Sequence, residues 1–305
     1  MLEKIQNQIN SGKDKIVIHN FRGNCIELVN FLKDCLINPS CPIKNLYFNA
    51  TFLENNCLRI LMSGLKENNS ITELTLANIF HDSNINQCLE YINNMLKKNK
   101  SITYLCLRNC NIEENISILI PGLKKSNIIS LNLEQNDLKT KGIENLKELI
   151  EDSSCILENL NLSENQISKT TLEKKLLPSI RKNITLFFVD IYHNIYSEEI
   201  EKKIEEKIKE ETDINKEIQK LWKQFSQRKS GFYTKEQENY LNRRPYRITN
   251  DNSKLPLQLR SLIQEYIPRD IKSNIELFIR WIMEKRGVDE YDVIVQKLIK
   301  YERSL

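Results

Sequence analysis

The chain has 305 residues, with 45 Lys and Arg against 41 Asp and Glu, and its formal net charge of +4 is small for that length. Charges of both signs are mixed along the chain, which does not favour nucleic acid or an anionic membrane surface as a partner. No window approaches the roughly 18 uncharged apolar residues of a membrane-spanning helix, and residues 1–6 lack the pattern of an export signal. We therefore expect neither nucleic-acid binding nor membrane insertion.

The number and spacing of the cysteines indicate the redox state of the compartment in which the protein acts. All eight lie at or before Cys155, at irregular spacings. This distribution suits free buried thiols better than a framework of disulfides, which is typical of small secreted domains. We expect a reducing compartment and hence a cytoplasmic protein.

The N-terminal segment is predicted to be a cap. Leu2, Ile5 and Ile9 share one face of a short helix, and residues 15–18 read as a strand, whereas residues 25–32 are predicted to be the first helix of the repeat array that follows. A cap of this kind shields the open end of a stack of repeats.

A repeated pattern then fills the sequence to Asn194. Its clearest copy, residues 157–167, has an apolar residue, a Leu-x-Leu alternation three residues later, and an Asn three residues after the second Leu. Residues 128–138 and 102–112 repeat this pattern, and shorter copies are present at 71–76, 43–48 and 184–189. The first apolar residues of the alternations are 26 to 31 residues apart: Leu46, Leu74, Leu105, Leu131, Leu160 and Phe187.

The spacing predicts one strand and one helix in each repeat. In the Leu-x-Leu alternation the leucines point inward and the residues between them outward, because a strand has a period of two. The Asn after it, or Cys110 in one copy, is predicted to turn inward and satisfy backbone groups. Helical periodicity follows each strand. The short step from Leu105 to Leu131 predicts a trimmed helix near residues 116–125 that begins or bends near Pro121-Gly122.

These residues resemble the ribonuclease-inhibitor type of leucine-rich repeat over about residues 16–194. The resemblance implies an α/β solenoid, a horseshoe with parallel strands inside and helices outside. Residues 1–194 would form this array with its N-terminal cap. Because the motif residues are the buried ones, the resemblance indicates the fold and says little about a partner.

The character of the sequence changes after Asn194, and residues 195–305 are predicted to be an all-helical C-terminal domain. It opens with a highly charged helix in which Ile200, Ile204 and Ile208 form a narrow apolar stripe. A small basic cluster, Arg243, Arg244 and Arg247, lies in a polar stretch of this domain and would suit phosphate or an acidic surface, with a solvated loop as the competing interpretation.

Signals of catalysis are missing from the sequence. The three histidines are far apart, and the seven glycines form none of the usual phosphate-binding loops. Cys106 and Cys110 are close in sequence but are predicted to face opposite sides of a strand, which does not favour a zinc site. We expect no enzyme activity, no cofactor and no bound metal.

The repeat geometry predicts a binding surface on the concave strand face of the array. Tyr47, Tyr104 and Arg108 are the first choices, because Tyr and Arg are enriched among the residues that dominate binding energy. Cys106 projects from the same face. The full predicted set is Tyr47, Asn49, Thr75, Tyr104, Arg108, Asn132, Glu134, Asn161, Ser163, Phe188 and Asp190.

The sequence therefore predicts a non-catalytic binding module or adaptor whose concave face holds another protein. The alternative is that the helical C-terminal domain is the active part and the repeats only select its target. Richness in Asn, Lys and Ile resembles the leucine-rich-repeat effectors of intracellular bacteria such as Legionella, which would make the partner a host protein, although an AT-rich protist would give the same composition. The sequence leaves the oligomeric state open.

Overall fold

The structure is a computed structural model, and it describes residues 2–21, 23–80, 84–152 and 154–226. The chain divides into two compact units, Met1–Asp213 and Ile214–Leu305. The boundary that we predict after Asn194 falls earlier than this division. Arg243, Arg244 and Arg247, and the helices predicted around them, lie outside the described residues.

The first unit is built on a sheet of seven parallel strands whose spatial order follows the sequence. Each strand pairs with the next so that one inward-facing apolar residue in each strand falls beside its counterpart, as the repeat spacing predicts. The strands are β1 (Lys15–His19), β2 (Asn45–Asn49), β3 (Glu73–Ala77), β4 (Tyr104–Cys106), β5 (Ser130–Asn132), β6 (Asn159–Asn161) and β7 (Phe188–Asp190).

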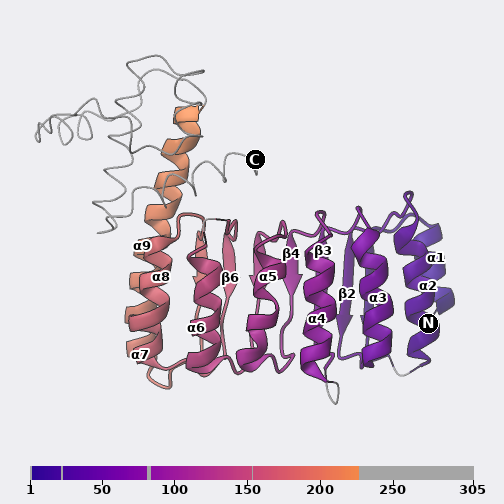
Figure 1. The fold of residues 1–305 in the computed structure, drawn as a ribbon, viewed down its shortest axis with the longest axis horizontal. Helices are drawn as coiled ribbons and strands as arrows, with labels where there is room; N and C mark the ends of the chain where they lie inside the picture. The colour runs from indigo at the N-terminus through magenta and orange to yellow at the C-terminus, as the bar shows by residue number, and fades with distance from the viewer. Residues whose placement is uncertain (1, 22, 81–83, 153, 227–305) are drawn as a thin grey trace, which may run out of the picture. The chain divides into compact units, whose positions relative to one another are not determined.

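Helices connect successive strands and lie in one layer against the sheet (Figure 1). The α-helices are α1 (Leu2–Asn10), α2 (Cys25–Ile37), α3 (Asn55–Glu67), α4 (Ile85–Leu96), α5 (Ile120–Leu123), α6 (Lys139–Ile150), α7 (Lys169–Thr171), α8 (Leu177–Lys182) and α9 (Glu198–Ser226). Two non-α pieces complete the layer: a 3₁₀ helix, Glu113–Ile118, and a π turn, Leu172–Leu176, that joins α7 to α8. The described residues thus form an α/β solenoid of the leucine-rich-repeat type.

The core lies between the sheet and the helix layer. In β5 and the residues after it, Leu131 and Leu133 point inward and are buried, and Leu146 and Ile150 of α6 meet them from the helix side. Every repeat places apolar side chains at the same positions, so a single core runs through the stack. A repeat cannot bury its apolar face without its neighbours, which makes the stack the stable unit.

The last repeat corrects the predicted frame. We predict the alternation at Phe187 and Val189, but the structure pairs Leu160 with Val189, and Leu186 takes the buried position that Leu157 holds one repeat earlier. The error is two residues, which is one full period of a strand. The predicted outward positions Phe188 and Asp190 therefore still face outward.

The trimmed helix is confirmed. Between β4 and β5 the chain forms only the 3₁₀ helix and the single turn of α5, with Pro121 in its first turn. Gly122 allows this turn to lie close to α4, because a Cβ there would stand 2.8 Å from the backbone oxygen of Asn93. The short connection accounts for the short spacing between Leu105 and Leu131.

The inward-turning asparagines are confirmed as a hydrogen-bonded ladder. The amide of Asn136 donates to the carbonyls of Leu107 and Leu133 and accepts from the backbone N–H of Cys110. Asn165 and Asn194 repeat this arrangement one and two repeats further on. Each side chain joins the backbone of its own repeat to that of the preceding repeat, which satisfies groups that no strand partner reaches.

A second asparagine ladder runs along the opposite end of the strands, and we did not predict it. Asn68 donates to the carbonyl of Leu36, and its oxygen accepts from the backbone N–H groups of Ser70 and Ile71. Asn99 and Asn183 do the same in their repeats. The signal was present in the sequence, since each of these residues stands three positions before a buried apolar residue.

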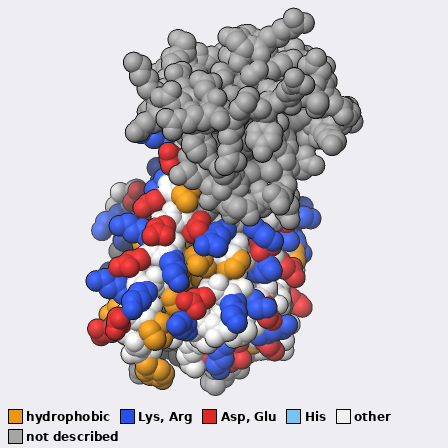
Figure 2. All heavy atoms as spheres, turned by 90° about the vertical axis from the view of Figure 1, so that its left-hand side faces the viewer, with side chains coloured by type: hydrophobic (Ala, Val, Ile, Leu, Met, Phe, Trp, Pro, Cys, Tyr) orange, Lys and Arg blue, Asp and Glu red, His pale blue; other side chains and the backbone are white. Residues whose placement is uncertain are grey.

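The charged helix predicted after Asn194 is α9, and its stripe is confirmed in part: Ile204 and Ile208 are buried. Arg181 of α8 pairs with Glu211 at 2.7 Å, and Glu173 pairs with Lys207 at 3.5 Å. Side chains of both signs are interspersed over this end of the array (Figure 2). Among the described helices, none is long and apolar enough to cross a membrane.

Candidate protein-binding face

The face of the sheet that the helix layer leaves uncovered is the candidate site, and we call it the open strand face. Its side chains stand in three rows that run across the strands, because the register is one to one. The first row contains Lys15, Asn45, Glu73, Tyr104, Ser130, Asn159 and Phe188. The second contains Val17, Tyr47, Thr75, Cys106, Asn132, Asn161 and Asp190. The third contains His19, Asn49 and Ala77, and backbone hydrogen bonds continue it just after the shorter strands with Arg108, Glu134, Ser163 and Tyr192.

Tyr47 is held between neighbours on both sides. Its hydroxyl donates to the carboxylate of Glu73 on β3, and the ammonium of Lys15 on β1 lies 4.7 Å from the centre of its ring. Burial, followed by the contact with Glu73, raises the pKa of Tyr47 to about 12. The ring is thus fixed in place and keeps its proton at neutral pH.

Tyr104 stands on β4, two strands from Tyr47, beside Glu73 of β3, and is half-buried. Burial, with Cys106 as the next cause, raises the pKa of Tyr104 to about 12. Tyr47 and Tyr104 both belong to the predicted set, and the structure brings them to the same part of the open strand face. A pair of rigid, partly exposed tyrosines is a common centre of a protein interface.

Arg108 makes polar contacts with the next repeat, and Glu134 extends them to the repeat after that. Its guanidinium Nε lies 3.1 Å from a carboxylate oxygen of Glu134 and donates to the side-chain oxygen of Gln135, also at 3.1 Å. Asn161 donates to the other oxygen of Glu134 at 3.5 Å. The Arg108 side chain remains 45% exposed, so the ion pair adds little stability and leaves the guanidinium accessible to a partner.

The second row also shapes the ends of the strands. The side-chain oxygens of Asn132, Asn161 and Asp190 each accept a hydrogen bond from the backbone N–H two residues later, at 2.8 to 3.0 Å. Part of their hydrogen-bonding capacity is therefore used within the turn, so they offer a partner fewer free acceptor sites.

Two predicted contact residues have little accessible surface. Thr75 is 9% exposed and Ser163 is 4% exposed, although both stand at outward positions of their rows. Asn49 is half-buried and accepts a hydrogen bond from Asn78. Thr75 and Ser163 therefore lie beneath the accessible surface of the face and offer a partner little contact area.

The structure adds two exposed residues that sequence reasoning missed. Val17 is 52% exposed and Tyr192 is 53% exposed. These exposed fractions are close to that of Phe188, a predicted contact residue, at 56%. The sequence pattern assigns the strand containing Val17 to a cap, although this strand pairs in the same register as the others. The outward position of Tyr192 follows from the corrected frame of the last repeat.

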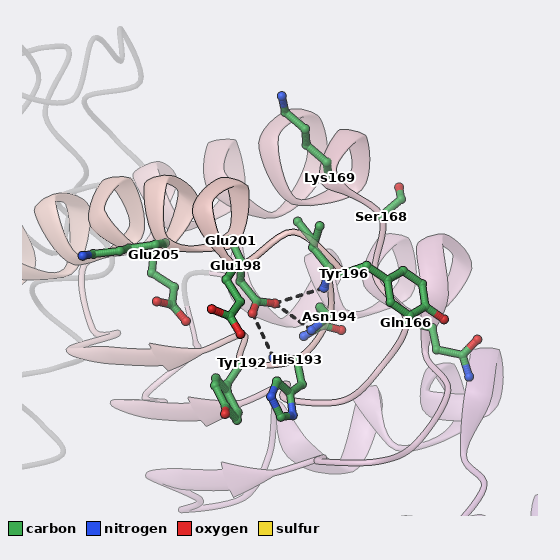
Figure 3. A pocket seen from close by; sticks show the side chains of 12 residues that line it. Gln166, Ser168, Lys169, Tyr192, His193, Asn194, Tyr196, Glu198, Glu201 and Glu205 are labelled. Atoms are coloured by element: carbon green, nitrogen blue, oxygen red, sulfur yellow. Dashed lines mark hydrogen bonds between the residues drawn. The ribbon is translucent and has the colours of Figure 1, made fainter.

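A hollow of about 970 Å³ opens beside the last strand (Figure 3). Tyr192 and Tyr196 line it together with Glu198 and Glu205 of α9, and the rings of Tyr192 and His193 stack 3.7 Å apart. The carboxylate of Glu201 accepts hydrogen bonds from three successive backbone N–H groups, those of His193, Asn194 and Ile195, at 2.7 to 3.1 Å. This anchors the loop after β7 to the first turn of α9.

The cysteines near the open strand face are placed as predicted, with Cys106 in an outward row and Cys110 beneath the strand ends. Burial raises the pKa of Cys110 to about 12 and also raises the pKa of Cys106, which keeps both thiols protonated and weakly nucleophilic. Among the described residues, no group of three or more His, Cys, Asp or Glu side chains could hold a metal ion.

Likeness to known proteins is found only at the level of structure. No protein-family model matches the sequence, and no curated protein matches it with significance. The structure of leiomodin-1 actin-binding site 2 is similar over 75% of this chain and 98% of that one, with 11% identity and a TM-score of 0.33. The tropomodulin C-terminal domain from Caenorhabditis elegans is similar over 65% of this chain and 99% of that one, with 12% identity and a TM-score of 0.38. Likeness at this level does not bear on what this chain binds.

Proposed function

We propose that this chain is a non-catalytic binding protein that holds another protein on its open strand face. The observation that carries the proposal is the set formed by Tyr47 on β2, Tyr104 on β4 and Arg108 just after β4, which neighbouring side chains hold in position. Preordered aromatic and guanidinium groups lose little entropy on binding, and such residues dominate the energy of protein interfaces.

The proposal also covers the type of repeat, the cellular compartment and the origin of the partner. We assign the repeats to the ribonuclease-inhibitor type, in which a helix follows each strand. All eight cysteines are free, which suits a reducing cytoplasm as the place of action. That the partner is a host protein, as for effectors of intracellular bacteria, rests on amino-acid composition only.

The test compares two pairs of substitutions in the full chain used as bait for affinity capture from a eukaryotic lysate. Tyr104→Ala with Arg108→Ala alters the open strand face. Tyr91→Ala with Arg59→Ala removes the same residue types from α4 and α3 on the helix layer. Truncating residues at the centre of an interface costs about 2 kcal/mol or more, so we expect the face variant to lose a captured protein by tenfold or more in quantitative mass spectrometry. The helix-layer variant should retain it.

Equal retention by the wild type and the face variant would contradict the proposal, and so would equal loss from both variants. A third variant addresses the alternative that the C-terminal domain carries the activity. If Arg243→Ala, Arg244→Ala and Arg247→Ala together abolish capture while the face variant does not, the repeats are a platform for that domain.

A further inference from the structure

One corner of the open strand face differs chemically from the rest. It comprises Phe188, Asp190 and Tyr192 on and just after β7, Tyr196 in the loop after that strand, and Glu198 and Glu205 on the first turns of α9. We call these six residues the acidic aromatic corner. Figure 3 shows Tyr192, Tyr196, Glu198 and Glu205 arranged around the hollow described above.

The aromatic side chains of the corner are unusually accessible. Among the described residues, six large hydrophobic side chains are exposed, and three of these are Phe188, Tyr192 and Tyr196. They recur at every fourth position, with Phe188 on β7 and the two tyrosines after it, and Glu201 holds the loop between Tyr192 and Tyr196 in place through three backbone hydrogen bonds. Clustered exposed rings on an anchored loop are characteristic of a contact surface.

Among the described residues, the carboxylates of the corner make no ion pair or hydrogen bond with a cationic or phenolic side chain, whereas the other charges named on the face each contact a side chain. Lys15 meets the ring of Tyr47, Glu73 accepts from the same tyrosine, and Arg108 pairs with Glu134. In the described part of the chain, Asp190, Glu198 and Glu205 form no ion pair. Lys169 and Lys202 also line the hollow, yet neither pairs with these carboxylates there.

The carboxylates also repel one another. Burial is the first cause that raises the pKa of Glu205, and the charges of Glu201 and Asp190 raise it further. A cation placed among them would relieve this repulsion. Carboxylates beside exposed tyrosine rings attract Lys and Arg in two ways, since the face of each ring also favours a positive charge.

We propose that the acidic aromatic corner receives Lys or Arg side chains from an extended, positively charged segment of the partner. This inference rests on the proposed function and deepens it, because it states the chemistry of the partner at one end of the open strand face. An anionic segment would meet repulsion from the carboxylates, and a purely apolar one would leave them desolvated without a partner.

The test measures binding of short dye-labelled peptides to the full chain by fluorescence anisotropy at low salt. One peptide alternates Arg and Ser, and two others replace every Arg by Glu or by Gln. We expect the Arg peptide to bind at least about tenfold more tightly than the other two, and its affinity to fall as salt is added.

Two charge-matched variants locate the site. Asp190→Asn with Glu205→Gln removes two carboxylates from the corner, and the Asn still accepts the hydrogen bond from the backbone N–H of Tyr192. Glu206→Gln with Glu210→Gln removes the same charge from exposed positions elsewhere on α9. The first variant should weaken binding of the Arg peptide by about tenfold, Tyr192→Leu by a few-fold, and the second pair by less than twofold.

Equal affinity for the Arg and Glu peptides would overturn the inference. So would equal weakening by the two charge-matched variants, since binding would then follow the total charge of the chain. Neither result touches the proposed function, which is decided separately by capture with the Tyr104 and Arg108 variant.

Discussion

At the scale of single residues, buried asparagines hold the repeats together. Asn165 is fully buried, and its amide donates to the carbonyls of Leu133, Leu162 and Ser163 at 2.9 to 3.0 Å. Its oxygen accepts from the backbone N–H groups of Asn136 and Leu138. One side chain therefore satisfies five backbone groups in two repeats, where a curved strand exit leaves them without strand partners.

We predict that Asn165→Ala destabilises the protein by about 3–5 kcal/mol, because each buried group that loses its partner costs about 1–3 kcal/mol. The measurement is the free energy of unfolding from urea titration monitored by circular dichroism. Asn132→Ala is the control, since that side chain is only partly buried and caps a single turn. A similar loss of unfolding free energy in both variants would contradict the prediction that the buried asparagine ladder contributes more stability than a single turn cap.

At the scale of elements, the connection between β4 and β5 shows how a short repeat is accommodated. The 3₁₀ helix and the single turn of α5 replace a full helix, and the turn approaches α4 closely at Gly122. A Cβ at that position would stand 2.6 Å from the side-chain oxygen of Asn93 and 3.1 Å from the Cβ of Leu96. The neighbours are backbone and buried side chains, so the helix layer would have to shift.

Gly122→Ala is therefore expected to destabilise the chain by about 1–3 kcal/mol through overpacking, although alanine is the better helix former. The thermal midpoint by circular dichroism provides the measurement. Pro121→Ala, at the exposed neighbouring position, should change stability by about 1 kcal/mol or less. A stabilised Gly122→Ala variant would mean that helix propensity outweighs the close contact.

At the scale of the whole molecule, a stack of repeats needs a closed end. Ile204 and Ile208 of α9 are buried, and Glu201 anchors the loop after β7. All three residues lie within the first compact unit, which extends to Asp213. A chain cut at the sequence-based boundary would lose these contacts and expose the apolar side of the last repeat.

We expect residues 1–213 to unfold in one cooperative transition and residues 1–194 to aggregate or to unfold at a clearly lower temperature. Terminal capping elements are required for the solubility of repeat arrays, which is the physical reason for the difference. Differential scanning calorimetry and size-exclusion chromatography of the two fragments provide the measurement. Identical behaviour of the fragments would show that the first turns of α9 are dispensable.

Much of the array could be predicted from the sequence, because its signal is local and repeated. The alternation around Leu131 and Leu160 and the inward Asn136 and Asn165 give the strand positions, the buried side and the first ladder. The frame of the last repeat was harder, since Phe187, Val189 and Ile191 offer two apolar alternations that are two residues apart. Only the pairing of Leu160 with Val189 chooses between them.

The candidate site depended on tertiary structure to a greater extent. By itself, the sequence determined which residues face outward from each strand, because the period of a strand is a local property. It did not determine which of these remain accessible, since Thr75 and Ser163 stand at outward positions and are nevertheless buried. Nor did it show that Asp190 of β7 lies close to Glu205 of α9. Burial and charge proximity depend on residues far apart in the chain, so only the folded stack decides them.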